Sequence, residues 1–451
     1  MFYTMSHHKR GLFTRRNLFF AYFIVHIVIG WGLLSLPVSW NGAHPLKLID
    51  ALFTSVSAVC VTGLITVDTA IYSKFGQIVI LYLIEAGGLG IITFSTLYLI
   101  LPRSKISFES RKMIQSYAIA GANVHPKNIV RFIVAYTLLM EFLGFFFLFY
   151  AFRSAADTEP FFNAAFHSVS AFCNAGFSRF SEGLVPFSYN IIINITIMML
   201  IILGGIGFMV VWDVIITSMR MKKHLEFHSR IMLIMTPILI FTGAVFFLIF
   251  EWDGALSDVN GIGYKIMGAF FQSVTTRTAG FNTIDEAALS GPSKGLTMIL
   301  MFIGAGSGST GGGIKVSTFF ICMIIVLRGI DPKGDIRIFK RRLSSQDISR
   351  AAMFALKAAS ILVVSVFLLV VTESVYDHDF SFLEMFFECA SAFGTVGLSL
   401  GITSSLSFWG KLVIIITMFA GRVGLFSMII PQSRKEILRY VEYPDGEVLI
   451  G

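Results

Sequence analysis

The chain has 451 residues, of which 55% are hydrophobic and only 14% are charged, against about a quarter charged in ordinary soluble domains. Its formal net charge is +8, and most lysines and arginines fall in short segments between apolar runs. This composition excludes a soluble or secreted domain, and the charge distribution argues against nucleic acid as a partner. It is typical of a polytopic membrane protein.

Eight apolar runs are long enough to cross a bilayer, which takes about 20 residues as a helix. They lie at 17–46, 75–102, 132–152, 183–212, 231–250, 295–327, 351–372 and 412–433. Four further uncharged stretches each lie between two of these runs, at 51–67, 160–178, 266–276 and 389–410. A helix of about ten residues rises only about 15 Å, half of the hydrocarbon core. We therefore expect these four stretches to enter the membrane and turn back.

Each short stretch contains a variant of one motif. The four versions are "SAVCVTGL" (57–64), "SAFCNAGF" (170–177), "TTRTAGF" (275–281) and "SAFGTVGL" (391–398). Their glycines are separated by 113, 104 and 117 residues, so the chain reads as one unit repeated four times. We predict an all-α membrane protein of four span–pore-loop–span units with pseudo-fourfold symmetry around one pore. The predicted units are 1–112, 113–222, 223–340 and 341–451.

The turn after each short helix must lie near the membrane centre, where non-helical backbone persists only if protein shields it or it lines water. A glycine there can adopt positive φ without a Cβ clash. Thirteen residues before three of the glycines stand Asp50, Asn163 and Glu384, at the expected helix starts, where Asp and Asn are good N-caps. The negative ends of the helix dipoles would then converge on the centre and favour a cation.

The second span of each unit carries a glycine motif: "EAGGLG" (85–90), "ILGGIG" (202–207) and "FAGRVG" (419–424). In the third unit it is expanded to "GAGSGSTGGGIKVST" (304–318). This insert is not a nucleotide-binding loop, because Ile314 precedes Lys315 and the Gly-Lys-Ser/Thr ending is missing. We interpret it as a broken helix across the conduction path, hence a gate, with an inert break in packing as the alternative.

Arg422 stands where two other units have Gly88 and Gly205. A charge at that depth is costly and is normally functional or paired. Arg422 could be an electrostatic barrier in the pore, or it could hold the insert by hydrogen bonds. A salt bridge to Glu85 is a further alternative.

Lysines and arginines concentrate in alternate connections. The segments 9–16, 103–131, 220–230, 328–350 and 434–439 hold 24 of the 35, whereas the other connections are acidic. This asymmetry predicts that the basic segments and both termini are cytoplasmic. The basic segment 328–350 could simply obey this rule or could dock a cytosolic partner.

Together these features resemble the superfamily of K⁺ transporters that includes the Trk, Ktr and plant HKT proteins. The resemblance rests on the four units, one glycine per unit, the insert "GAGSGSTGGGIK" and the arginine in "AGRVG". The motifs "TTRTAGF" and "SAFGTVGL" and the closing "YPDGEV" are most similar to the Ktr-type membrane subunit. The resemblance implies a homodimer in the bacterial plasma membrane, with one pore per subunit and a cytosolic nucleotide-binding regulatory ring as partner.

On this hypothesis K⁺ is the transported ion, with Na⁺ coupling in some members, and no cofactor is expected. The predicted selectivity filter uses backbone carbonyls at Val61, Thr62, Gly63, Asn174, Ala175, Gly176, Thr278, Ala279, Gly280, Thr395, Val396 and Gly397. The predicted gate comprises Gly306, Ser307, Gly308, Ser309, Thr310, Gly311, Gly312, Gly313, Lys315 and Arg422.

Two other functions stay open on the residues alone. One is conduction that is Na⁺-selective or unselective among monovalent cations. The other is an intramembrane enzyme, which would need a catalytic pair or a metal cluster at one depth. His167, Ser168 and Cys173 could suggest a nucleophilic set, but His167 is matched by Thr54 and Glu388 in other units. The position therefore requires polarity and not a base, and we predict no catalytic residues.

Overall fold

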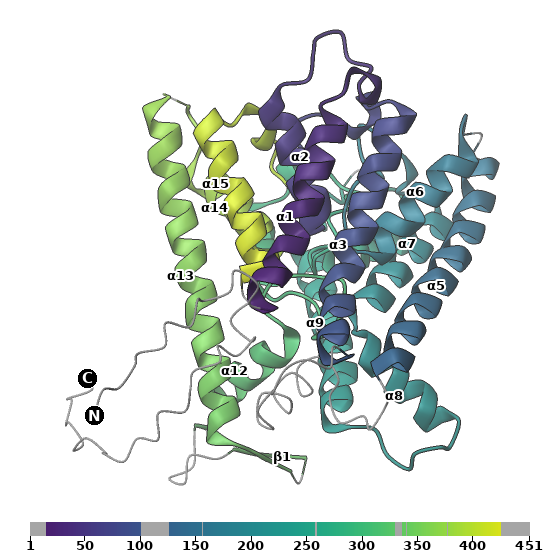
Figure 1. Ribbon diagram of the computed structural model, residues 1–451, viewed down its shortest axis with the longest axis vertical. Helices are drawn as coiled ribbons and strands as arrows, with labels where there is room; N and C mark the ends of the chain where they lie inside the picture. Colours follow the sequence, from purple (N-terminus) through teal and green to yellow (C-terminus); the bar gives the residue numbers. More distant parts are fainter. Residues whose placement is uncertain are drawn as a thin grey trace, which may run out of the picture.

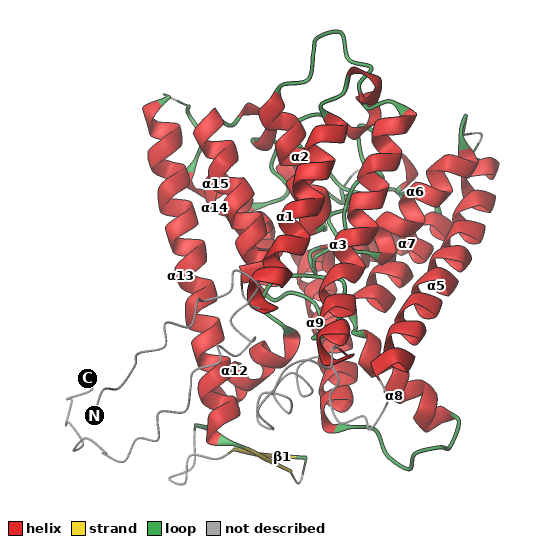
Figure 2. Ribbon diagram, viewed as in Figure 1, coloured by secondary structure: helices red, strands yellow, loops and turns green. Residues whose placement is uncertain are grey.

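The computed structural model describes residues 15–100, 126–155, 157–257, 259–329, 336–339, 341–376 and 378–424. Helices dominate this part of the chain, and one small hairpin lies at one end of the molecule (Figure 2). In Figure 1 the long helices run roughly parallel to the long axis, and irregular loops fill the space between them near the middle. This is the arrangement of a multi-pass membrane protein whose loops converge inside a helical wall.

The order of the described helices is compatible with the predicted repeat, and a helix of 13 or 14 residues occupies the middle position in each predicted unit. The first two units contain α1 (Arg15–Leu34), α2 (Leu48–Cys60), α3 (Lys74–Ile100), α5 (Pro126–Ser154), α6 (Pro160–Phe172), α7 (Ile191–Gly205) and α8 (Phe208–Ser218). The last two contain α9 (Phe227–Glu251), α10 (Ile262–Thr275), α11 (Gly291–Phe302), α12 (Val316–Arg328), α13 (Ser345–Val375), α14 (Phe382–Gly394) and α15 (Phe408–Phe419). A π-helical turn, Ala420–Gly424, continues α15.

Each of the eight predicted spans overlaps a described helix or a broken pair of helices, although the helix in 17–46 ends at Leu34 and the described part of 412–433 ends at residue 424. By length and apolarity alone, three of the described helices can cross a bilayer: Asn128–Ser154, Phe227–Glu251 and Ser345–Val375. A fourth span results if α7 and α8, which are bent by 94° at their junction, count as one. The structure therefore supports a multi-pass protein, and the count of eight crossings stays a prediction.

The short helices begin earlier than the sequence predicted. Their N-caps are Lys47, Glu159 and Ser381 in units 1, 2 and 4, and only Ser381 caps its helix through its side chain. The expectation that Asp50 and Asn163 are N-caps is wrong, because both lie inside the first turn. There Asp50 forms a buried ion pair with Lys411 at 2.8 Å instead. The fourth short helix, predicted within 389–410, occupies Phe382–Gly394.

Helix packing makes the four units follow one another in a closed cycle. The helix after each glycine motif packs on the short helix of the next unit: α3 on α6, α7 on α10, α11 on α14, and α15 on α2. Within units 1 to 3 a serine hydroxyl ties the short helix to the first long helix. Ser55 donates to the carbonyl of Ile27, Ser168 to that of Glu141, and Ser273 to that of Ile240, at 2.6–2.7 Å. Ile27, Glu141 and Ile240 are therefore equivalent positions.

The basic segment 328–350 contains structure that the sequence did not predict. Strands β1 (Ile336–Ile338) and β2 (Arg341–Leu343) pair in an antiparallel hairpin. Ile336 and Ile338 face inward and pack in the same apolar cluster as Met232 and Ile324. The hairpin thus fixes this segment against α9 and α12 and leaves the arginines of β2 exposed.

Candidate functional site

The four motif loops share one backbone conformation. The predicted glycines Gly63, Gly176, Gly280 and Gly397 have φ of 89°, 70°, 77° and 98°, so the expected positive φ is present at all four. The residue two positions earlier also has positive φ in each loop: 57° at Val61, 59° at Asn174, 70° at Thr278 and 50° at Thr395. A side chain in this region is strained, and such strain tends to mark functional sites.

The four loops close a ring in chain order. A Cβ built on Gly63 would lie 2.4 Å from the carbonyl oxygen of Ala175, and one on Gly176 would lie 2.7 Å from that of Ala279. A Cβ on Gly280 would lie 2.1 Å from the Val396 oxygen, and one on Gly397 would lie 2.3 Å from the Thr62 oxygen. Each glycine is thus pressed against the next loop, and the fourth against the first. No residue larger than glycine fits at these positions without displacing a carbonyl.

Hydroxyl groups of the short helices hold the loops in this shape. Ser57 and Ser391 accept hydrogen bonds from the glycine amides at 3.1 and 3.0 Å. In units 2 and 3, Ser170 and Thr275 donate to the carbonyl that follows the glycine, at 2.8 and 2.6 Å. The residue before each glycine is Thr62, Ala175, Ala279 or Val396, and among these only Thr62 has a side-chain oxygen, which has no hydrogen-bond partner in the described part of the chain. The loop therefore presents backbone oxygens that its own helix has fixed in place.

A second polar position ties each short helix to the chain beyond the ring. Tyr72 donates to Thr54 at 3.1 Å, and the His167 ring lies 3.0 Å from the Ser178 hydroxyl. The corresponding contacts in units 3 and 4 are Gln272 to Glu286, at 2.8 Å, and Thr403 to Glu388. The prediction that this position requires polarity and not a base agrees with these contacts. The sequence did not indicate their partners.

The glycine-rich insert lies directly against the ring. A Cβ on Gly311 would lie 2.2 Å from Oγ1 of Thr278, and a Cβ on Gly312 would lie 2.2 Å from Oγ1 of Thr395. The insert begins and ends in a bridge between Ile303 and Ile314, so it forms a closed loop between α11 and α12. Most of its residues are buried. The insert therefore packs closely on the third and fourth motif loops.

Backbone and hydroxyl contacts hold the insert against unit 2. The Gly306 and Thr310 amides donate to the carbonyls of Gly205 and Gly204 at 2.8 and 3.2 Å. The Thr310 hydroxyl contacts the carbonyls of Phe172 and Gly204 at 3.2 and 3.1 Å. Ser309 donates to Gly306 within the insert at 2.7 Å. The insert contains five glycines in 306–313 and forms no helix there, so these individual hydrogen bonds determine its position.

Both predicted gate cations contact carbonyl groups. Arg422, which is buried, donates to the carbonyl of Gly87 on α3 at 2.8 Å and to the carbonyl of Thr310 in the insert. Lys315 donates to the carbonyl of Gly311 at 2.7 Å. The suggested Arg422–Glu85 salt bridge is absent among the described residues. Of the alternatives for Arg422, this geometry favours a hydrogen-bonded anchor for the insert, and a buried cation near the ring can act as a barrier as well.

The arrangement is suited to passing a dehydrated cation. Four loops meet in a ring, each follows the carboxyl end of a short helix, and the insert packs on the ring, so backbone oxygens and helix carboxyl ends are available there to a cation. The buttressing hydroxyls and the second positive-φ residue were missed by sequence reasoning. A serine or threonine five or six residues before each glycine was a usable signal for the former.

Comparison with known proteins assigns the chain to a family. The TrkH family model, described as cation transport protein, matches residues 14–438. The chain is 36% identical over 435 residues to the Ktr system potassium uptake protein B of Bacillus subtilis, covering 95% of each chain. It is 35% identical over 442 residues to the potassium/sodium uptake protein NtpJ of Enterococcus hirae, covering 96% of this chain and 97% of the relative.

A solved structure has the same fold. The potassium transporter TrkH from Vibrio parahaemolyticus superposes with a TM-score of 0.70 at 22% identity, covering 94% of this chain and 86% of that one. The matching family is one of transporters and not of enzymes. The chain therefore belongs to the TrkH family of cation transport proteins.

Proposed function

We propose that the chain is the translocating subunit of a potassium uptake system and that K⁺ passes through the ring of four glycine loops. The single observation that carries this proposal is the closed ring, in which a carbonyl from each loop presses on the glycine of its neighbour. The names of the relatives, a potassium uptake protein and a potassium/sodium uptake protein, support the same reading.

The filter works through backbone oxygens that replace the hydration shell of the ion. Because these oxygens carry no net charge, an ion binds strongly enough to enter and weakly enough to leave. The paired positive-φ residues in each loop turn consecutive carbonyls towards the axis. With one glycine per loop and four unequal loops, the filter has fewer tight carbonyl rings than that of a symmetric tetramer.

The membrane topology belongs to this proposal. Eight crossings and four re-entrant helices place the ring near the membrane centre, with the hairpin end and both termini in the cytoplasm. The outer surface of the helices supports a lipid-facing wall, since large apolar side chains such as Phe142, Phe241 and Phe367 are more than 60% exposed. The plasma membrane of a bacterium is the expected location.

The insert and Arg422 act as the gate on the cytoplasmic side of the filter. Gly311 and Gly312 lie against the filter threonines, so the insert must move before an ion can leave. Arg422 links the insert to α3 and stabilises the closed arrangement. A regulatory signal that weakens the hydrogen bonds from Arg422 would open the gate.

We infer two kinds of partner, a second copy of this chain and a cytosolic regulatory subunit that binds nucleotide. The support is that relatives are named as components of a Ktr system. The exposed arginines of the β1–β2 hairpin offer a docking surface for such a subunit. Because the chain lacks a complete phosphate-binding motif, calorimetry on the isolated protein should detect no ATP or ADP binding.

Na⁺ is the second candidate ion. One relative is named a potassium/sodium uptake protein, and a filter with few carbonyl rings discriminates less sharply between the two ions. We therefore include Na⁺ as an alternative substrate or a co-transported ion.

Rubidium flux into proteoliposomes tests the function. External K⁺ should compete with rubidium uptake far more strongly than Na⁺ does. Equal competition would favour the unselective alternative, and the absence of flux from folded protein would contradict the proposal.

A further inference from the structure

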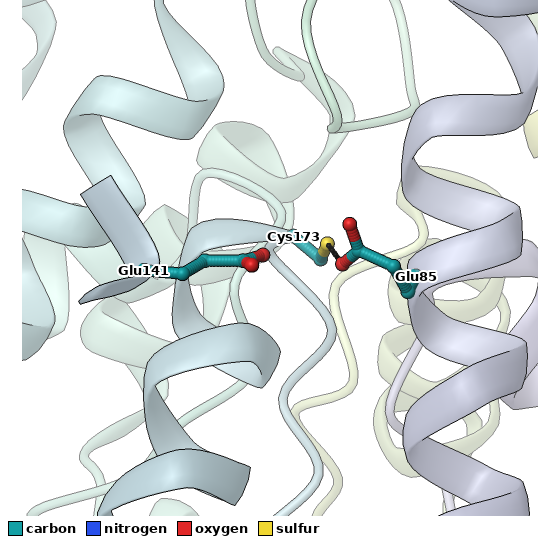
Figure 3. A group of neighbouring side chains, drawn as sticks. All are labelled: Glu85, Glu141 and Cys173. Carbon is teal, nitrogen blue, oxygen red and sulfur yellow. Dashed lines mark hydrogen bonds between the residues drawn. The ribbon is translucent and has the colours of Figure 1, made fainter. Parts of the chain in front are cut away.

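Three ionisable side chains meet behind the second filter loop, away from the ion path. They are Glu85 on α3, Glu141 on α5, and Cys173 at the carboxyl end of α6 (Figure 3). Cys173 directly precedes the filter residue Asn174. The cluster thus joins two units, since α3 belongs to the first and α5 and α6 to the second.

The donor atoms of the three side chains all lie within 4.8 Å of one another. The Cys173 thiol donates to Oε2 of Glu85 at 3.3 Å. Glu141 points into the cluster from the opposite side, as Figure 3 shows. Only 9% of Glu141 is exposed, and its Oε1 atom has no hydrogen-bond partner among the described residues. A buried carboxylate oxygen without a partner is costly, so this atom of the cluster is open to a further donor or a cation.

The described residues do not supply a cation there. Within the described residues, neither carboxylate lies within salt-bridge distance of a lysine, arginine or histidine. The nearby Arg422 directs its NH groups to the carbonyls of Gly87 and Thr310 instead. Two neighbouring carboxyl groups at this depth of a membrane protein must either share a proton or bind a cation. A bound cation satisfies the free oxygen and the charge together.

The residues packed around the cluster leave space for the Cys173 thiol. A Cβ on Gly88 would lie 2.8 Å from the Cys173 sulfur, so only glycine leaves space for the thiol at that point. On the other side, the Ser168 hydroxyl donates to the Glu141 carbonyl at 2.6 Å and fixes α5 against α6. The side chains therefore project from helices that are held rigidly together.

The ligand set selects the class of cation. A thiolate with two carboxylates suits a borderline or soft divalent ion such as Zn²⁺ or Cd²⁺ rather than Mg²⁺ or Ca²⁺, which prefer oxygen ligands alone. Zinc binds sulfur at about 2.3 Å and carboxylate oxygen at about 2.0–2.2 Å, so small side-chain movements would close the present separations. Three protein ligands leave a fourth position for water.

We propose that Glu85, Glu141 and Cys173 bind a thiophilic divalent cation of the Zn²⁺ class. On binding, the thiol loses its proton to the solvent and the thiolate and carboxylates coordinate the ion. The ion then links α3 and α5 to the base of the second filter loop. It holds that loop from behind and does not enter the conduction path.

Cadmium titration of tag-free, metal-free protein in lipid nanodiscs tests the site, with the thiolate-to-cadmium charge-transfer absorbance as the signal. We expect one saturable Cd²⁺ per chain and competition by Zn²⁺. Cys173→Ser should abolish the signal, and Glu85→Gln and Glu141→Gln should weaken binding about tenfold or more. Cys60→Ser is the matched control, because Cys60 occupies the equivalent place in unit 1, where Ile27 replaces the carboxylate.

Several outcomes would overturn the proposal. They are the absence of a saturable signal in the wild type, a signal that survives Cys173→Ser, or one that Cys60→Ser removes as well. If Cys173→Ser does not fold, the isosteric Glu141→Gln decides, and unchanged affinity in that variant contradicts the site. Rubidium flux in metal-free buffer is a separate measurement, so failure of the site leaves the transport function untouched.

Discussion

The interface between units 1 and 2 and the interface between units 2 and 3 are built alike but filled with different chemistry. Behind the filter, the first brings together Glu85, Glu141 and Cys173. The equivalent positions in the second are Ile202, Ile240 and Arg277, which line a small cavity. One interface thus has two carboxylates without a cation, and the other has a buried cation among apolar side chains. The repeated units share a backbone arrangement, whereas the charged side chains at each interface between units differ.

Introducing a glutamate at the position equivalent to Glu141 in another unit should have the largest effect, and this effect is on the free energy of unfolding. Ile27→Glu introduces a buried charge beside Cys60, where the nearby Arg422 already donates to two carbonyl groups, and we expect the free energy of unfolding to fall by about 4 kcal/mol. Ile240→Glu places the same charge near Arg277, whose Nε has no hydrogen-bond partner in the described part of the chain, and should cost clearly less. Denaturant titration in lipid–detergent micelles measures both. Equal losses would show that Arg277 does not compensate a charge at this interface.

The contact of Gln272 with Glu286 in unit 3 and the contact of His167 with Ser178 in unit 2 should differ in how they make the stability of the protein depend on pH. Burial raises the pKa of Glu286 to about 8, despite a hydrogen bond from Gln272 that lowers it. The folded protein therefore keeps a proton that the unfolded chain releases above its ordinary pKa of 4.5. Stability is full below that value and declines, by on the order of a few kcal/mol, as the pH rises through about 8.

Glu286→Gln removes this titration and should flatten the decline in the thermal midpoint between pH 5 and pH 8. Ser178→Ala, at the corresponding contact of unit 2, is the control and should leave the pH slope unchanged. A variant that declines as steeply as the wild type would assign the slope to another group.

On the pore side the two interfaces are alike, and their glycines should respond alike. A Cβ at Gly63 would meet the Ala175 carbonyl oxygen at 2.4 Å, and a Cβ at Gly176 would meet that of Ala279 at 2.7 Å. Serine at either position should lower the preference for K⁺ over Na⁺ by about tenfold, or about 1.4 kcal/mol. Gly63→Ser should be the more severe because its contact is tighter. Rubidium uptake in competition with each ion gives the ratio.

Gly263→Ser is the control for these variants, since no atom lies within 4 Å of a Cβ there. Unchanged selectivity in both Gly63→Ser and Gly176→Ser would count decisively against the filter assignment.

The smallest expected effect concerns Arg422, which reaches the first interface through Gly87. Arg422→Ala should raise K⁺ flux about fivefold, equivalent to about 1 kcal/mol, because it removes hydrogen bonds that hold the insert closed. Arg422→Lys distinguishes the role of Arg422 as an anchor of the insert from its role as a charge barrier. The lysine keeps the positive charge but lacks the guanidinium group that donates to the carbonyls of Thr310 and Gly87. Flux is compared at equal amounts of folded protein in the membrane.

Shortening the insert within 306–313 should act in the same direction and weaken control by a regulatory partner. Wild-type or lower flux in both Arg422→Ala and the shortened variant would make the insert a packing element, and control would then lie in the filter.

The sequence predicted the elements whose causes are local. Apolar runs located the long helices, and the steric demand of positive φ located Gly63 and its three counterparts. The second positive-φ position was not predictable, because Val61 and Thr395 are β-branched residues that ordinarily avoid this conformation. Glu384 was correctly expected near the start of the fourth short helix, but the uncharged stretch assigned to that helix began too late, at 389, because Glu384 and Glu388 interrupt the apolar run.

Contacts between segments far apart in the chain could not be predicted from local sequence patterns. The Asp50–Lys411 pair joins residues 361 positions apart, and nothing near either residue indicates the other. The cluster of Glu85, Glu141 and Cys173 likewise forms only when three helices pack together. The repeat could have revealed it, since aligning the units shows that these positions are elsewhere apolar or basic.

The closed ring also constrains how the protein is made. The loop at Gly397 packs on the loop at Gly63, and Lys411 pairs with Asp50, so the first unit lacks its last neighbour until the fourth has been synthesised. During translation the growing chain therefore holds an open arc of three units with one buried acid unpaired. Ribosome-bound intermediates should remain impermeable to ions, and a functional pore should form in a single late step of biogenesis.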